Sequence, residues 1–289
     1  TNLSRDHLDY HKTLTSYKNS KILLFKNHTK KNSIGVINSD SKFSKFFYET
    51  CYKQKIKVLD FGKKAKFVKI LKLKKFKDFF KLYISINKKK FDFELKSISE
   101  FEIYNKICAL LIVHGESLNK EDFNILNKIS SPSGRIEKIR NKKNLNIFVD
   151  YAHTPDAVKN VLSSLRKDCS GNIITVIGCG GERDKTKRPL MTKEALKLSH
   201  KVIITDDNPR NEDPQVIRKE MKMELTKNEK KKIKEIPNRK KAIQYSISIL
   251  KKNDYLLIAG KGHENYQIIK NKKINFSDKK EAIKFINKK

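Results

Sequence analysis

The chain contains 289 residues, and its 66 Lys plus Arg exceed its 32 Asp plus Glu, which gives a formal net charge of +34. Hydrophobic residues make up 37% of the chain and include 16 Phe and 10 Tyr, which is enough to build packed cores and excludes wholesale disorder. No apolar run of about 18 residues occurs, so the sequence predicts no membrane-spanning helix and no membrane partner, and we expect a cytoplasmic location.

The positive charge raises the alternative of a lysine-rich protein that binds nucleic acid, since phosphate contacts release counterions. The basic residues, however, are mostly lysines spread along the whole chain, and no nucleic-acid-binding motif accompanies them. This distribution indicates a solvated surface and predicts no specific nucleic-acid partner. The four cysteines lie far apart without a CxxC pair, which excludes a disulfide scaffold and a zinc knuckle.

The first half of the chain changes from α/β units to alternating strands. The first predicted elements are helices at 14–25 and 41–54 and strands at 34–38 and 56–61. From residue 66 to 95, short alternating segments separated by Lys- and Asn-rich turns predict antiparallel strands. Ser99 and Glu102 form a capping-box pattern before an apolar helix, and a second helix is expected at 120–129.

Residues 130–135, with the sequence SSPSGR, are the best candidate for a linker because Ser, Pro and Gly together break regular structure. Beyond them, strands and helices alternate, which predicts a parallel, Rossmann-like sheet. The predicted strands are 146–149, 172–177, 201–205 and 255–259, the predicted helices begin at Pro155, Pro189, Pro214, Arg239 and Asp278, and a hairpin is expected at 267–276.

Four loops directly follow predicted strands of this second half and carry residues that can handle anions or cations. Their sequences are DYAHTP (150–155), GCGGERDKTKRP (178–189), DDNPRNEDP (206–214) and GKGHE (260–264). Because ligands bind beyond the carboxyl ends of strands in such sheets, we expect the loops to meet in one site. The residues that they would supply are Asp150, His153, Arg183, Lys185, Lys187, Arg188, Asp207, Asn208, Arg210, Lys261, His263 and Glu264. Taken singly, each also fits an ordinary turn or helix cap.

The chemistry of these loops points to a ligand that carries both signs of charge. The glycines of the GCGG turn predict close backbone approach to a ligand and free amides at a helix start. Arg183 and Arg210 offer bidentate forks for a carboxylate or phosphate, whereas Asp207 and Glu264 are suited to hold an ammonium group. An amino-acid substrate requires a pocket of this kind.

Near the start of the chain, SRDHLDYH (4–11) places two carboxylates and two histidines close together, and Lys21 follows in a helical pattern. His7 and the carboxylates could ligate a metal, although Mg²⁺ prefers oxygen ligands. The alternative is a helix-capping turn with solvated charges.

The motifs of both halves resemble, in order along the chain, those of the Mur ligase family. They are TNLSRDHLDYH, GRIE, DYAHTPDA, GCGGERDKTKRPLM, DDNPRNEDP, GKGHENYQ and FSD. Within the family, the resemblance is to the ligases that add the third residue of the peptidoglycan peptide. It implies an α/β fold with two parts: the C-terminal part of a central ATPase domain over 1–132, and a Rossmann-like C-terminal, amino-acid-binding domain over 133–289.

The resemblance also implies an ATP-dependent, ADP-forming amide ligation. The γ-carboxylate of UDP-N-acetylmuramoyl-L-alanyl-D-glutamate would attack ATP to give an acyl phosphate, and the amine of meso-diaminopimelate would then attack the acyl carbon. ATP and Mg²⁺ are the implied cofactors, and we expect a monomer. The DNPR motif implies diaminopimelate because Arg210 can bind the distal carboxylate that lysine lacks. The alternatives are a lysine-adding relative and a ligase like folylpolyglutamate synthetase.

Site residues follow from motif position within this resemblance. His7 and Lys21, the latter carbamylated, correspond to metal-binding and catalytic positions, and His153 corresponds to a further catalytic position. The positions on the nucleotide side are Asn105, Arg135 and Asp150, and those of the diamino-acid pocket are Arg183, Asp207, Asn208, Arg210, Gly260 and Glu264.

The sequence departs from the family pattern in several places. Glu182 stands where Asp is usual, Thr186 where Gly is usual, and Ser20 where Ala is usual, and FEIYN (101–105) is a weakened nucleotide motif. No GxxGK[ST] phosphate loop occurs, and the family's N-terminal uridine-nucleotide domain is missing. We therefore expect an N-terminally truncated enzyme that cannot use ATP by itself.

Overall fold

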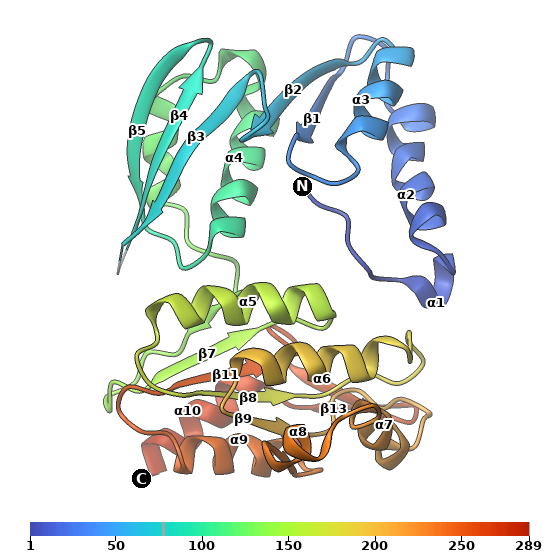
Figure 1. Ribbon diagram of the computed structural model, residues 1–289, viewed down its shortest axis with the longest axis vertical. Helices are drawn as coiled ribbons and strands as arrows, with labels where there is room; N and C mark the ends of the chain where they lie inside the picture. Colours follow the sequence, from blue (N-terminus) through green and yellow to red (C-terminus); the bar gives the residue numbers. More distant parts are fainter. Residues whose placement is uncertain (77–78, 289) are drawn as a thin grey trace. The chain divides into compact units, whose positions relative to one another are not determined.

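The structure of the chain is a computed structural model that describes residues 1–76 and 79–288 (Figure 1). These residues form two compact units. The first comprises Thr1–Ser4 and Tyr10–Ser130, and the second comprises Arg5–Asp9 together with the chain from Ser131 onward. Arg5–Asp9, called the 5–9 segment below, therefore belongs to the second unit although its neighbours in sequence belong to the first. No helix in the described part of the chain is both long and apolar enough to cross a membrane.

The first unit is built on a five-stranded sheet whose strands lie side by side in chain order. They are β1 (Ile34–Asn38), β2 (Lys57–Gly62), β3 (Val68–Lys75), β4 (Phe80–Ile86) and β5 (Lys89–Leu95). β1, β2 and β3 pair in parallel, whereas β3, β4 and β5 pair antiparallel. The predicted change to antiparallel strands is thus confirmed. Strand β4 shows the alternation on which this prediction rests. Its buried residues alternate with less buried ones, so one face of the strand meets the core.

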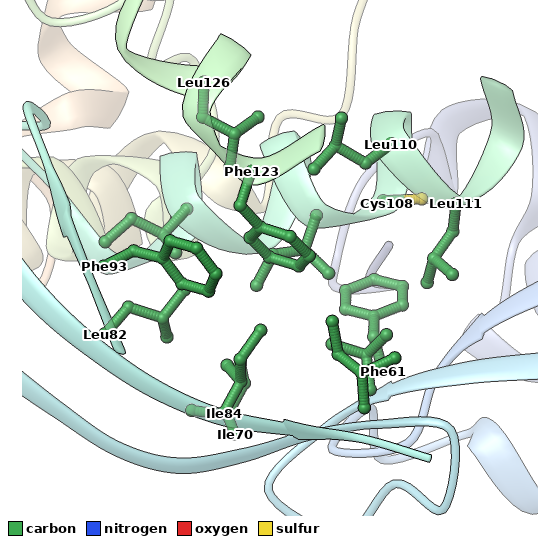
Figure 2. Packing of buried hydrophobic residues seen from close by; sticks show 14 of the residues in the cluster. Phe61, Ile70, Leu82, Ile84, Phe93, Cys108, Leu110, Leu111, Phe123 and Leu126 are labelled. Carbon is green, nitrogen blue, oxygen red and sulfur yellow. The ribbon is translucent and has the colours of Figure 1, made fainter. Parts of the chain in front are cut away.

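The helical elements before Ser130 complete this part of the chain. They are α1 (Leu8–His11), α2 (Leu14–Leu23) with the π-helical turn η1 (Leu24–His28), α3 (Ser44–Lys53), α4 (Glu100–His114), and the 3₁₀ turns η2 (Gly115–Ser117) and η3 (Glu121–Asn127). The apolar face of the sheet packs against α4 and η3, and Figure 2 shows this core. Phe123 of η3 stacks on Phe93 of β5 with ring centroids 4.8 Å apart.

Helix α4 begins as its sequence predicts, but with half of the expected capping box. The hydroxyl of Ser99 accepts a hydrogen bond from the amide of Glu102 at 3.3 Å. The carboxylate of Glu102 accepts from the hydroxyl of Ser97 at 2.5 Å and pairs with the buried ammonium of Lys106. A neighbouring hydroxyl and a lysine one turn later therefore compete for the carboxylate that a capping box would use.

The helix expected at 120–129 is instead the 3₁₀ turn η3. Its two buried residues, Phe123 and Leu126, are three positions apart. Residues three positions apart lie on the same side of a 3₁₀ helix, so both side chains can face the core. The predicted helix is therefore present, but as a 3₁₀ helix that is shorter than expected.

The second unit contains a six-stranded sheet in the order β10-β9-β8-β11-β7-β6. All neighbours pair in parallel except β6 and β7, which are antiparallel. The strands are β6 (Glu137–Lys138), β7 (Asn146–Asp150), β8 (Ile173–Ile177), β9 (Lys201–Ile204), β10 (Ile233–Glu235) and β11 (Tyr255–Ala259), and a separate hairpin is formed by β12 (Tyr266–Ile269) and β13 (Lys272–Asn275). The expected parallel, Rossmann-like sheet and the hairpin are confirmed.

Helices cover both faces of this sheet (Figure 1). They are α5 (Pro155–Asp168), α6 (Lys187–Leu198), α7 (Pro214–Met221), α8 (Lys227–Lys231), α9 (Arg239–Ser248) and α10 (Asp278–Lys288). α5 and α6 lie on one face, and α9 and α10 lie on the other, where they share a core with Ile174, Leu256 and Ile258. Because both faces are covered, the central strands are apolar along their whole length, as parallel strands require.

Candidate active site in the second unit

The four loops that follow β7, β8, β9 and β11 meet at one edge of the sheet and enclose a cavity of about 200 Å³. The 5–9 segment forms part of its wall. The lining residues are Asp6, His7, Asp9, Tyr151, His153, Gly178, Cys179, Gly180, Arg183, Lys187, Asp207, Asn208, Arg210, Gly260 and Glu264. All six residues expected in a diamino-acid pocket line this cavity, together with His7 and His153.

A buried ammonium group organises the polar wall of the cavity. Lys261 is fully buried, and its Nζ donates to Oδ1 of Asn208 at 2.9 Å and to Oε2 of Glu264 at 2.7 Å. Nδ2 of Asn208 donates to the same Oε2 of Glu264 at 3.0 Å. The sequence placed Lys261 in the loop inventory but gave it no role. Its role here is to fix the orientation of two side chains that line the cavity.

Asp207 lies between two buried cations without a close hydrogen bond to either. Its Oδ1 is 3.8 Å from Nζ of Lys261, and its Oδ2 is 3.9 Å from Nη1 of Arg239. Gly260 has a φ of +115°, and a Cβ there would lie 2.7 Å from Oδ2 of Asp207. Glycine is therefore required at this position both for the backbone conformation and for space beside the carboxylate.

Arg210 is held against the GCGG turn. Its Nη1 donates to the carbonyl of Gly181 at 2.7 Å, and its amide donates to the carbonyl of Ile268 in β12 at 3.0 Å. A Cβ on Gly180 would lie 2.9 Å from Nη1 of Arg210, and one on Gly181 would lie 2.0 Å from the carbonyl oxygen of Pro209. The amide of Gly181 donates to the carbonyl of Asn208. Gly181 thus lets two loops pack together, and its amide is not free as expected, whereas Gly178 and Gly180 line the cavity and the close approach of a ligand to them stays a prediction.

Two residues of the 5–9 segment are fixed to the rest of the second unit. Nε2 of His153 lies 3.6 Å from Oδ2 of Asp6, and Arg5 donates to the hydroxyl of Thr186 at 2.5 Å and lies 3.6 Å from Asp184. Although burial opposes ionisation, His153 and the other cationic or donor groups nearby lower the pKa of Asp6 to about 2. The capping-turn alternative for this segment does not account for these long-range contacts.

The protonation of His153 is constrained by its surroundings. Its Nδ1 lies 2.8 Å from the carbonyl oxygen of Tyr151. A carbonyl can only accept, so Nδ1 carries a proton and Nε2 is the atom that can exchange one. Nε2 also faces Asp6, so a proton gained there would be shared with a carboxylate.

The nucleotide-side residues of the second unit lie outside the cavity lining. Asp150 is 3% exposed, and its carboxylate accepts from the amides of Ile136 at 2.7 Å and Ala152 at 2.6 Å. Burial raises the pKa of Asp150, although these hydrogen bonds oppose the shift. The guanidinium of Arg135 lies 4.8 Å from the ring centroid of Tyr151. Asp150 thus ties the GRIE segment to the DYAH turn.

Lys21 and Asn105 belong to the first unit. Lys21 lies in the last turn of α2, is exposed, and borders a separate cavity with Phe25 of the π-helical turn. Asn105 is exposed on α4. In the described part of the chain, no three or more His, Cys, Asp or Glu side chains form a group that could hold a metal. His7 and the described carboxylates therefore fit at most part of a Mg²⁺ shell.

Sequence reasoning gave no role to three other residues of the cavity wall. Tyr151, Cys179 and Lys187 all line it. Burial raises the pKa of the Cys179 thiol to about 12, so it is a neutral part of the wall. Tyr151 and Cys179 follow β7 and β8 directly, and this position was the signal that could have identified them.

Two family models match the chain, and together they cover most of it. The Mur ligase middle domain matches residues 1–113, and the Mur ligase, glutamate ligase domain, matches residues 134–262. The chain therefore belongs to the Mur ligase family, and the fold class expected from its motifs is confirmed.

Individual relatives agree with this family. The chain is 41% identical over 281 residues to the UDP-N-acetylmuramoyl-L-alanyl-D-glutamate--2,6-diaminopimelate ligase of Rickettsia montanensis, across 96% of the chain and 57% of that protein. A solved structure of a ligase with this same name has 33% identity and a TM-score of 0.60, across 99% of the chain and 59% of that structure. The folylpolyglutamate synthase of Mycobacterium tuberculosis, complexed with ADP and AMPPCP, has a TM-score of 0.71 at 16% identity, across 90% of the chain and 60% of that structure, which is a likeness of fold alone. The chain spans a little over half the length of the curated relatives it matches.

Proposed function

We propose that this chain supplies the diamino-acid pocket of an ATP-dependent, ADP-forming ligase of peptidoglycan synthesis. The ligase would join meso-diaminopimelate to UDP-N-acetylmuramoyl-L-alanyl-D-glutamate. The observation that carries the proposal is the cavity of the second unit, where acidic and basic side chains from four loops meet. The 41% identical relative is a ligase whose name carries both substrates.

The charge pattern of the cavity suits a diamino acid with two carboxylates. Asp207 and Glu264 face the cavity and would hold an ammonium group, with Asn208 fixed beside them by Lys261. Arg210 would bind the distal carboxylate, since its guanidinium is already fixed by the carbonyl of Gly181. Lysine has no distal carboxylate, so it would leave this arginine without its partner.

In the proposed reaction, the chain's residues orient the amine and manage its proton. ATP supplies the phosphoryl group that activates the γ-carboxylate of the dipeptide as an acyl phosphate. The amine then attacks the acyl carbon and releases phosphate. Nε2 of His153 can exchange a proton and lies 3.6 Å from the carboxylate of Asp6, and we propose it as the group that accepts the proton of the amine.

The remaining residues of the site are proposed on family resemblance. His7 and a carbamylated Lys21 are proposed as Mg²⁺ ligands on this resemblance alone. Asn105 and Arg135 would contact the nucleotide, and Asp150 would hold the turn that carries His153. We further propose a cytoplasmic monomer.

The proposal can be tested on the chain itself by NMR titration, which detects the weak binding expected of one unit of a larger site. We expect meso-diaminopimelate to shift the amide resonances of Asn208, Arg210 and Glu264 in a saturable way. L-lysine and L-glutamate at the same concentration should shift them less. Equal responses to the three amino acids, or shifts that fall outside the cavity, would contradict the proposal.

A further inference from the structure

Lys187 is a buried cation in the cavity wall. It is the first residue of α6, it is 7% exposed, and it borders the cavity beside Asp6 and Cys179. Among the residues that the structure describes, none accepts a hydrogen bond from its ammonium group or forms an ion pair with it. A buried charge without such a partner is costly, so this position calls for an explanation.

The neighbouring cations of the same loop differ from Lys187 in this respect. Arg188 donates to Glu212 at 2.9 Å and also pairs with Glu220. Lys185 lies 3.5 Å from Glu212. Glu212 and Glu220 are therefore engaged by Lys185 and Arg188. Asp6 feels the charge of Lys187 across the cavity wall, but its carboxylate lies against His153.

The start of α6 has the character of an anion site. No side chain caps the first turn of α6 and that turn contains no acidic residue, although the amide of Thr186, just before the helix, donates to Asp184 at 3.0 Å. By contrast, Thr154 caps α5 and Asp213 caps α7. The positive end of the helix dipole and the ammonium of Lys187 thus act in the same place, and an anion would satisfy both.

We propose that Lys187 and the start of α6 form an oxyanion subsite of the cavity, which takes a carboxylate or a phosphoryl group. Within the proposed function, the oxyanion comes either from a carboxylate of the diamino acid or from the phosphoryl group of the acyl phosphate. The subsite itself does not depend on that function, because only Lys187 and the start of α6 form it.

The test uses inorganic phosphate on the intact chain, at constant ionic strength with chloride as the balancing anion so that screening of the +34 charge stays fixed. We expect phosphate to shift the amide resonances of Gly180 and Lys187 in a saturable way. In Lys187→Met, which keeps the apolar length of the side chain, the Kd for phosphate should rise about tenfold or more. Lys187→Arg should retain most of the affinity.

The matched control is Lys193→Met. Lys193 lies on the same helix and pairs with Glu224 at 2.9 Å, outside the cavity lining, so the variant loses the same charge from a different place. Its Kd for phosphate should equal that of the unmodified chain. Lys187→Met should also raise Tm in the absence of phosphate, since it removes a buried unpaired charge.

A second titration identifies the source of the oxyanion. If phosphate and meso-diaminopimelate exclude each other, the subsite belongs to a carboxylate of the amino acid, and if both bind together it belongs to the phosphoryl group. The titration with phosphate needs no amino acid, so it still tests the oxyanion subsite if the proposed function is wrong. An unchanged Kd in Lys187→Met, or phosphate shifts that lie elsewhere in the unmodified chain, would overturn the proposal.

Discussion

The two units differ in how many charged side chains they bury, with Asp60 and Lys106 in the first unit and a larger set in the second. The core of the first unit is almost wholly apolar, with Phe61, Leu82 and Phe123 at its centre (Figure 2). In the second unit, charged side chains such as Arg239 and Lys261 are also buried around the sheet. Buried ion pairs add little net stability, because desolvation offsets their attraction. The difference therefore indicates that the second unit has charges placed for a site rather than for stability alone.

The largest expected effect is the loss of stability when the buried ion pair between Arg239 and Asp278 is broken. It tests the difference between the two units. Nε and Nη2 of Arg239 donate to the carboxylate of Asp278 at 2.7 Å each, and both residues are almost fully buried. Arg239→Met leaves Asp278 buried without a partner and should lower the free energy of unfolding by about 3–5 kcal/mol, measured by urea denaturation. The control is Lys240→Ala, which breaks a more exposed pair with Glu281 between the same helices and should cost less than about 1 kcal/mol.

A double variant distinguishes an unpaired charge from lost packing as the cause of this destabilisation. Arg239→Met combined with Asp278→Leu removes both charges and should recover much of the lost stability. If the double variant were no more stable than Arg239→Met alone, the loss would come from packing and not from an unpaired charge.

The comparable substitution in the first unit removes a buried apolar side chain. Leu82 is fully buried at the centre of the core, so Leu82→Ala should lower the free energy of unfolding by about 3 kcal/mol through lost burial and a cavity. Binding of meso-diaminopimelate below the unfolding transition should keep the Kd of the unmodified chain, because Leu82 belongs to the first unit. A changed Kd would show that a cavity in the core of the first unit alters ligand binding by the second unit.

A smaller effect is expected from Gly260→Ala. The residue has a φ of +115°, and the new Cβ would lie 2.7 Å from Oδ2 of Asp207. Strain of this kind costs about 1–3 kcal/mol, which thermal unfolding would report. Because Asp207 must also move, the variant should lose affinity for meso-diaminopimelate, whereas Gly115→Ala, in the first unit at a φ of +58°, should affect stability only.

The smallest effect concerns acid stability in the second unit. The hydrogen bond from Arg188 lowers the pKa of Glu212 from its ordinary 4.5 to about 2, although burial opposes the shift. A carboxylate with a lowered folded-state pKa stabilises the fold above the unfolded pKa and loses this contribution as the pH falls from about 4.5 toward 2. Glu212→Gln should therefore flatten the decline of Tm over that interval. A decline as steep as that of the unmodified chain would assign the acid sensitivity to other carboxylates.

Much of the fold could be predicted because local patterns determine it. The strand at 34–38 and the helix from Pro155 follow from apolar runs and caps that act over a few residues. The short strands β6 and β10 were missed since two or three residues carry no detectable periodicity. They pair only because longer strands already provide an edge.

The site was predictable as a set of loops but not in its internal contacts. Strand order placed the four loops together, so Asp207 and Glu264 could be expected in one cavity. The assignment of the 5–9 segment to the second unit depends on contacts over long sequence distances, such as Asp6 to His153, which no local pattern encodes. The role of Lys261 was equally hidden, because a buried lysine between a carboxylate and an amide looks in sequence like any other lysine.

The central claim is that the second unit holds a pocket selective for a diamino acid with a distal carboxylate. The most direct test is the ratio of the Kd values for L-lysine and meso-diaminopimelate, measured on the unmodified chain and on Arg210→Ala. We predict that the unmodified chain favours meso-diaminopimelate and that Arg210→Ala lowers the ratio about tenfold or more, since a charge-assisted contact is lost. An unchanged ratio in Arg210→Ala would contradict the account.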